Sequence, residues 1–314
     1  MRLAVIGRRA LSGVVVLVGV SILSFSLIQL LPGDTAAAIA GDFATPEQIE
    51  AIREQLGLNQ PVILQYFTWL GHVLQGDFGT SLATGRPALE MILEAVPPTA
   101  SIALVSLTIS TIVGLGVGLL AALNRGRWVD HLLSFLASIS ISAPAFWILL
   151  LMVLFFAILN RWLPAVGYVP LSAGFWPWLS HILLPAIALS FTHGAEIARY
   201  TRGSVIDVLA APYIRAARAR GARGGWLAGR HLTRNSAIPI VTVLGLQLGN
   251  MLGGVIVVES VAGINGLGGF AVTSVLSRDY IALQAYVLFA AVVIVIVNLI
   301  VDILYTIINP KVRS

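Results

Sequence analysis

Tyr213-Ile-Arg-Ala-Ala-Arg-Ala-Arg-Gly221 lies in a basic stretch, Arg199 to Asn235, that separates two uncharged apolar runs. Pro212 suits the first turn of a helix, alanine and arginine favour helical backbone, and Gly221 can end the helix in a left-handed cap. The pattern predicts a helix of about two turns. Eight of the chain's 19 Lys and Arg residues lie in this stretch: Arg199, Arg202, Arg215, Arg218, Arg220, Arg223, Arg230 and Arg234.

Two interpretations of the basic stretch stay open from these residues alone. It can be an ordinary positively charged cytoplasmic loop, which explains the arginines. It can also be a docking element, because Ala216, Ala217 and Ala219 would let a partner approach closely while Arg215, Arg218 and Arg220 carry charge. The first interpretation does not explain an alanine-rich helix bracketed by Pro212 and Gly221, but the residue pattern alone does not decide between the two.

The composition places the chain in a membrane. Of its 314 residues, 58% are hydrophobic and 11% are charged, and the mean hydropathy is +0.92. One soluble core could not bury so much apolar surface. A net charge of +5 could suggest nucleic-acid binding, but the positive charges lie between apolar runs, where membrane topology predicts them. We therefore expect no nucleic-acid partner and an all-α integral membrane protein in contact with lipid.

Residue types that the chain lacks exclude several activities. It has no cysteine, which excludes disulfides, thiolate metal sites and thiol catalysis. Its single lysine, Lys311, is followed by valine, so the Gly-Lys-Ser/Thr of a phosphate-binding loop is absent. We expect no catalytic residue, no metal site and no cofactor bound by this chain.

Apolar runs predict six membrane-spanning helices, because each is long enough to cross a hydrocarbon layer that needs about 20 helical residues. The first run is longer than the apolar part of a signal peptide, which favours an uncleaved anchor. Pro144 predicts a kink in the third span. The six predicted spans are residues 10–31, 99–123, about 132–159, about 179–198, about 237–258 and 281 to about 308.

Three regions follow from these spans. Residues 1–31 form the cytoplasmic N-terminus and first span, and residues 32–98 form an external segment. In that segment we expect helices from Pro46 to near Gly57 and from Pro61 to Leu74, with aromatic residues packing against a neighbour or the membrane surface. A turn containing Gly76, Asp77, Gly79 and Ser81 follows. Residues 99–314 form a five-helix core whose cytoplasmic coupling loop covers about 199–236.

Small residues recur at four-residue spacing in two spans, which permits close helix approach. They are Ser106, Ser110, Gly114, Gly118 and Ala122 in the second span, and Gly245, Gly249 and Gly253 in the fifth. Helix packing is the default interpretation of both faces, and lining of a translocation path is the functional one. Glu196 is expected to pair with Arg199 or Arg202 within one helical turn rather than to relay protons.

The charge distribution predicts the orientation. Segments assigned to the cytoplasm hold 15 of the 19 Lys and Arg residues, and the external segments hold only Arg53, Arg86, Arg161 and Arg278. This asymmetry predicts a multi-pass protein with both termini in the cytoplasm.

The residues resemble the B-type permease subunit of the dipeptide, oligopeptide and nickel group of ABC importers. Residues 213–221 and Arg230-His-Leu-Thr-Arg-Asn235 are similar to the cytoplasmic EAA loop of that family, although Arg215 stands where the general motif has glutamate. The resemblance covers nearly the whole chain. Other similar segments are Leu31-Pro-Gly-Asp34, Gly76-Asp-Phe-Gly-Thr-Ser81, Val258-Glu259, Gly266-Leu-Gly268, Arg278-Asp-Tyr280 and Asn298-Leu-Ile-Val-Asp302.

The resemblance implies the type I importer permease fold in a bacterial or archaeal plasma membrane. It implies that residues 213–221 form the coupling helix, and that this chain forms half of a path for peptides or a related small solute. The implied partners are a homologous second permease, two cytoplasmic ATPase domains that use ATP and Mg²⁺, and an extracytoplasmic solute-binding protein.

Two other classes of protein are the alternatives. An ion-coupled secondary transporter would use ionisable groups at the bilayer midplane and often has internal repeats, whereas these spans are nearly free of such groups. An intramembrane hydrolase would need a Ser/His or metal set, but no His-Glu-x-x-His pattern exists and His181, His193 and His231 are scattered.

Overall fold

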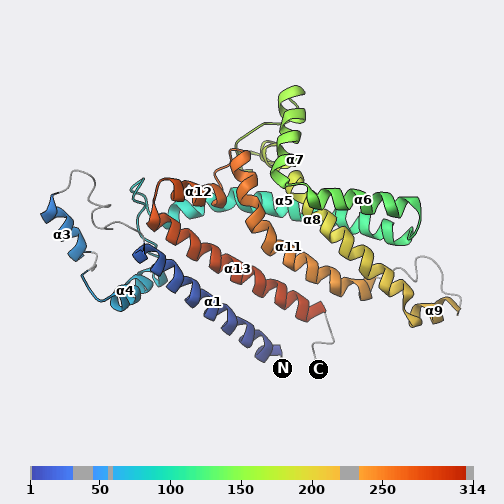
Figure 1. Cartoon of the computed structure of the whole chain (residues 1–314), viewed down its shortest axis with the longest axis horizontal. Helices are drawn as coiled ribbons and strands as arrows, with labels where there is room; N and C mark the ends of the chain where they lie inside the picture. The colour runs from blue at the N-terminus through green and yellow to red at the C-terminus, as the bar shows by residue number, and fades with distance from the viewer. Residues whose placement is uncertain (1, 31–44, 56–58, 220–232, 309–314) are drawn as a thin grey trace. The chain divides into compact units, whose positions relative to one another are not determined.

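The computed structural model describes residues 2–30, 45–55, 59–219 and 233–308 (Figure 1). These residues are nearly all helical, and no strand occurs among them apart from one isolated bridge between Thr80 and Pro87. The elements are α1 (Arg2–Leu30), α3 (Pro46–Gln55), α4 (Val62–Leu74), α5 (Ala88–Leu123), α6 (Trp128–Ser142), α7 (Ala145–Met152), the π-helix η1 (Val153–Leu159), the 3₁₀ turn η2 (Leu171–Ala173), α8 (Phe175–Ala210), α9 (Pro212–Ala219), α11 (Thr233–Val261), α12 (Leu267–Leu276) and α13 (Tyr280–Ile308).

Several helices are long and apolar enough to cross a membrane. Within the described ranges there are four, and five if the bent pair of Trp128–Ser142 with Ala145–Leu159 counts as one span. α11, which covers the predicted fifth span, is not among those counted. The all-α membrane fold is therefore confirmed, and the number of six spans stays a prediction.

The chain divides into two compact units, each described separately. The first contains Pro97–Gly268 and Val297–Ser314 with Met1–Arg2, and the second contains Leu3–Val96 and Gly269–Ile296.

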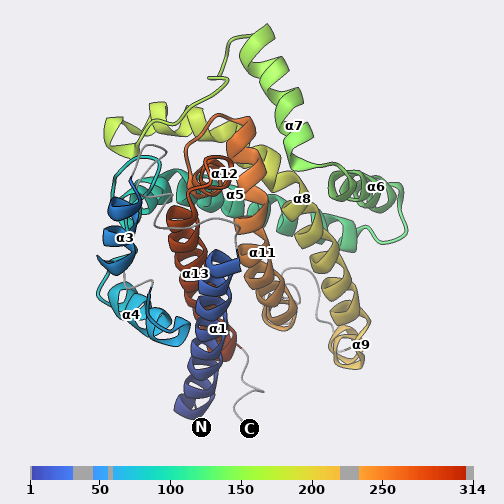
Figure 2. The same ribbon diagram turned by 60° about the vertical axis from the view of Figure 1, so that its left-hand side comes forward.

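α8 is the central helix of the first unit. It packs against α6, α7 and α11, and Figures 1 and 2 both show α8 and α11 running side by side. The buried core draws Leu149 from α7, Ile182 and Leu189 from α8, and Met251 and Val255 from α11. Because these side chains carry no polar atoms that need partners, packing holds this part of the contact between the helices.

Pro144 separates α6 from α7, and the two helices differ in direction by 99° (Figure 2). Ala143 and Pro144 have extended backbone, as expected for a proline and the residue before it. The predicted kink is confirmed and is a complete break of the helix rather than a mild bend.

In the second unit, α1 packs against α4 through aromatic rings. The ring of Phe25 lies 5.5 Å from those of both Tyr66 and Trp69. The hydroxyls of Ser21 and Tyr66 are 2.8 Å apart. The aromatic face predicted on the second external helix therefore packs on a neighbouring helix of the same chain.

Three helix boundaries differ from the expectations. α5 begins at Ala88 rather than near Thr99 and contains Pro97 and Pro98, so these prolines do not end it. α8 continues beyond Ala198 to Ala210. α12 starts at Leu267, between the predicted fifth and sixth spans, where no helix is predicted.

Candidate functional site

The helix predicted within the basic stretch is α9, and a single residue separates it from α8. The amide of Ala211 donates to the carbonyl of Val208 over 3.1 Å, and the amide of Ile214 donates to that of Ala211 over 3.1 Å. Ala211 is extended and Pro212 is the first residue of α9, so the chain changes direction in one step.

One side chain anchors α9. Ile214 is fully buried against Val208 and Ala211, whereas Tyr213 is 44% exposed and Ala216 is also exposed. The helix therefore keeps a fixed contact with the end of α8, and the described residues leave part of its surface uncovered. Arg215, Ala217, Arg218 and Ala219 belong to α9, while Arg220 and Gly221 lie outside the described residues.

An ion pair with a buried carboxylate lies further back along α8. The Arg202 guanidinium donates from Nε and Nη2 to the two carboxylate oxygens of Asp130 over 2.6 and 2.8 Å. The amide of Gly126 donates to the same carboxylate over 3.0 Å. Asp130 is in the first turn of α6, so the pair joins α6 and the turn before it to α8.

The expected pairing of Glu196 with Arg199 or Arg202 is wrong for Arg202, which faces α6. Glu196 instead accepts a hydrogen bond from Nε2 of Gln247 on α11. Oε1 of Gln247 lies 2.6 Å from Nδ1 of His193, and the Gln247 side chain is buried. These three residues form a polar chain between α8 and α11, as buried polar groups require.

The two predicted faces of small residues differ in the neighbours that they contact. A Cβ on Gly114 would lie 2.7 Å from the carbonyl oxygen of Gly194, and one on Gly118 would lie 2.5 Å from that of Ala198. Both glycines therefore lie where α5 touches α8. In the fifth-span set, a Cβ on Gly245 would collide with Val301, whereas Gly249 and Gly253 have nothing within 4 Å.

Glu259 and Thr99 hold the start of α12. The Thr99 hydroxyl donates to the Glu259 carboxylate over 2.5 Å and accepts from the amide of Leu267 over 2.8 Å. Glu259 also accepts from the amide of Gly268 over 2.8 Å and is fully buried. A carboxylate at a helix N-terminus satisfies the free amides and complements the helix dipole.

The predicted external turn lies on the start of α13. The Ser81 hydroxyl donates to the buried carboxylate of Asp279 over 2.5 Å. The amide of Gly79 donates to Asp77 over 2.9 Å, and Gly76 and Gly79 both have positive φ. A Cβ on Gly79 would lie 2.7 Å from the Ile281 side chain. The turn chemistry therefore gives these residues a packing role within their unit.

Within the described residues, no group of three or more His, Asp and Glu side chains could hold a metal ion. The arrangement is one of helix contacts, an anchored short helix and buried polar links between helices. It can transmit movement between helices.

The chain is similar to known proteins over nearly its full length. Residues 114–314 match the sequence model described as "Binding-protein-dependent transport system inner membrane component", and residues 2–103 match the model of its N-terminal region. The chain is 40% identical over 306 residues to a probable peptide ABC transporter permease protein, y4tP, of Sinorhizobium fredii, covering 98% of both chains.

The chain is also similar to a second permease protein and to a solved transporter structure. The glutathione transport system permease protein GsiC of Salmonella paratyphi A is 42% identical, covering 98% of this chain and 97% of that one. An inward-facing crystal form of the MetNI methionine ABC transporter gives a TM-score of 0.59 at 17% identity, covering 70% of this chain and 96% of that one. At that identity the second similarity concerns the fold alone.

Proposed function

This chain belongs to the family of binding-protein-dependent transport system inner membrane components, and from that premise we propose that it forms one half of an ATP-driven import path for peptides or a related small solute. The family excludes the alternatives of an ion-coupled secondary transporter and an intramembrane hydrolase. The membrane protein is a permease, and the energy for transport comes from separate subunits.

The substrate class is proposed from the relatives. Proteins named for peptide and for glutathione transport match this chain at 40 to 42% identity over nearly its full length. Glutathione is itself a small peptide, so both names point to a peptide backbone with free charged groups. The path would be completed by a homologous second permease, and an extracytoplasmic binding protein would deliver the substrate.

The observation that carries the mechanism is the anchored helix α9. Burial of Ile214 at the end of α8 gives α9 a fixed attachment to the central helix of the first unit. An ATPase domain that moves α9 would therefore also move α8. The ion pair of Arg202 with Asp130 and the contact of Gln247 with Glu196 would pass that movement to α6 and α11.

The proposed orientation places α9 and both termini in the cytoplasm. It rests on the excess of arginine in the segments between apolar runs. In this orientation α9 would meet one of the two ATPase domains. Those domains would hydrolyse ATP with Mg²⁺, and we expect this chain to bind neither ATP nor Mg²⁺.

A charge placed on the exposed part of α9 tests the coupling. We expect Ala216→Glu to lower ATP-dependent uptake of a labelled dipeptide by about tenfold or more, because an unpaired charge desolvated at an interface costs roughly 2 kcal/mol or more. Uptake is measured in proteoliposomes that contain the complete transporter and its binding protein.

The matched control is Ala173→Glu, which adds the same charge at an exposed alanine of η2. This variant should keep uptake within twofold of the unchanged protein. Equal uptake by both variants at equal protein content would refute the role of α9 as the coupling helix.

A further inference from the structure

A groove lies between α5, α6 and α8 in the first unit. It consists of two adjoining cavities of about 220 and 410 Å³. Four residues line both cavities: Val117, Leu133, Ala137 and Ala198. Most of the wall is aliphatic or alanine, and the larger cavity contains no charged residue in its lining.

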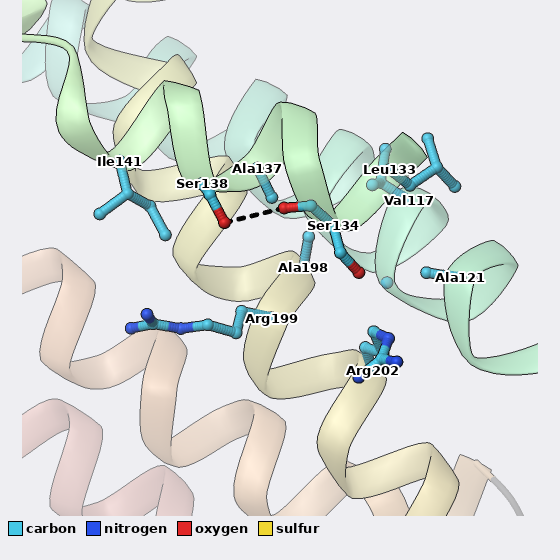
Figure 3. A pocket seen from close by; sticks show the side chains of 11 residues that line it. Val117, Ala121, Leu133, Ser134, Ala137, Ser138, Ile141, Ala198, Arg199 and Arg202 are labelled. Carbon is cyan, nitrogen blue, oxygen red and sulfur yellow. Dashed lines mark hydrogen bonds between the residues drawn. The ribbon is translucent and has the colours of Figure 1, made fainter. Parts of the chain in front are cut away.

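The charge of the groove is confined to one end. Figure 3 shows Arg199 and Arg202, both from α8, beside the smaller cavity, with Ser134 and Ser138 on the facing helix α6. The Ser138 hydroxyl donates to the Ser134 carbonyl over 2.9 Å. The groove is therefore complementary to an anionic amphiphile, because it has a long apolar part and a cationic end.

The cationic end keeps a net positive charge. Arg202 donates hydrogen bonds from Nε and Nη2 to Asp130, so the net charge of that ion pair is close to zero. For Arg199, the contact found within the described residues is with the ring of Tyr200, 5.8 Å from its guanidinium carbon. The exposed Arg125 and Arg127 flank Gly126, whose amide binds Asp130, so they lie at the same end.

The length of the groove matches an acyl chain. Its lining on α8 runs from Ile187 to Arg202, roughly 22 Å at 1.5 Å per residue. The hydrocarbon layer of one leaflet is about 15 Å deep. An acyl chain lying in the groove could therefore have its headgroup beside the arginines.

We propose that this groove binds an anionic phospholipid of the surrounding membrane, with an acyl chain along α5, α6 and α8 and its phosphate at Arg199. A guanidinium pairs well with phosphate oxygens, and basic recesses between membrane helices suit anionic headgroups. A neutral apolar partner would leave Arg199 without an anion. The lipid would support the packing of α6 on α8, beside the ion pair that joins them.

Photocrosslinking tests the site on the complete purified transporter, and it requires no transport activity. The probe is phosphatidylglycerol with a diazirine on its acyl chain, in phosphatidylcholine nanodiscs. We expect adducts on peptides that contain groove residues, and competition by unlabelled phosphatidylglycerol but not by added phosphatidylcholine. Arg199→Gln should lower the adduct yield by roughly fivefold.

Two further variants complete the test. Arg8→Gln removes an exposed arginine that is not part of the groove and should leave the yield unchanged. Ala137→Phe places a large side chain where the two cavities adjoin and should abolish the adducts. If Ala137→Phe does not fold, the result for Arg199→Gln decides the test. Equal competition by both lipids, an unchanged yield in Arg199→Gln, or groove adducts formed mainly with a protein partner would overturn the proposal.

Discussion

Thr99 and Glu259 are two polar residues that hold the beginning of α12 inside an apolar helix bundle. One hydroxyl joins a buried carboxylate to the Leu267 amide, and that carboxylate also receives the Gly268 amide. A Cβ on Gly266 would collide with the Glu259 carboxylate, so this arrangement also requires glycine at that turn. Loss of the hydroxyl would remove the acceptor of the Leu267 amide and one of the donors to the Glu259 carboxylate.

The variant Thr99→Val removes the hydroxyl at nearly constant volume. Each buried polar group left unsatisfied costs about 1–3 kcal/mol. We expect the midpoint of thermal unfolding in detergent to fall by roughly 3–8 °C. Thr99→Ser keeps the hydroxyl and loses only a methyl group, so it should lose less than half as much. A loss in Thr99→Val no larger than the loss in Thr99→Ser would show that the hydrogen bonds are not responsible.

At the residue scale, the sequence identifies polar residues but not their partners. Glu259 is recognisable as the end of an apolar run, and Glu196 as a carboxylate near two arginines. Because α8 continues as a helix, Arg202 faces α6 while Glu196 contacts α11, and both partners lie more than 50 residues away in sequence. Spacing along the sequence predicts that a charged residue pairs with the nearest opposite charge. Here the packing of the helices gives these residues partners on other helices.

At the scale of elements, α5 and α8 come close together because glycine leaves room for backbone. Gly114 and Gly118 lie against Gly194, Ile197 and Ala198 on α8. The four-residue spacing in the sequence predicts such a face in both glycine-bearing spans. It does not tell which face meets a helix. A Cβ on Gly249 or Gly253 would have no described residue within 4 Å.

The contact between α5 and α8 can be tested with a matched pair of variants. In Gly118→Ala, the new Cβ would lie 2.5 Å from the carbonyl oxygen of Ala198 and 2.7 Å from Cβ of Thr201, so the helices must separate. We expect a loss of about 1–3 kcal/mol in unfolding free energy.

Gly116→Ala is the control, because nothing lies within 4 Å of the added atom. Higher helix propensity should leave this variant as stable as the original or more stable by up to about 1 kcal/mol. Reversible unfolding in mixed micelles gives both values. A Gly118→Ala variant as stable as Gly116→Ala would mean that α5 and α8 are not in close contact.

At the scale of the whole molecule, hydropathy predicts the membrane class and most of the helices. It predicts helix ends less well, because α5 runs through Pro97 and Pro98 and α8 runs through Arg199 and Arg202. The short helix α12 was missed, since its glycines are typical of loops when their close contacts are unknown. Its start depends on Glu259 and also on Thr99, which is distant in sequence.

The central claim is that α9 couples this permease to an ATPase. The chain has no cysteine and its only lysine is Lys311, so Ala216→Cys gives a unique thiol with little competition from the chain's own amines. A short thiol-to-amine crosslinker applied to the assembled complex should join position 216 to the ATPase subunit, and Ala173→Cys should not. Absence of that product from position 216, or an equal yield from position 173, would contradict the account.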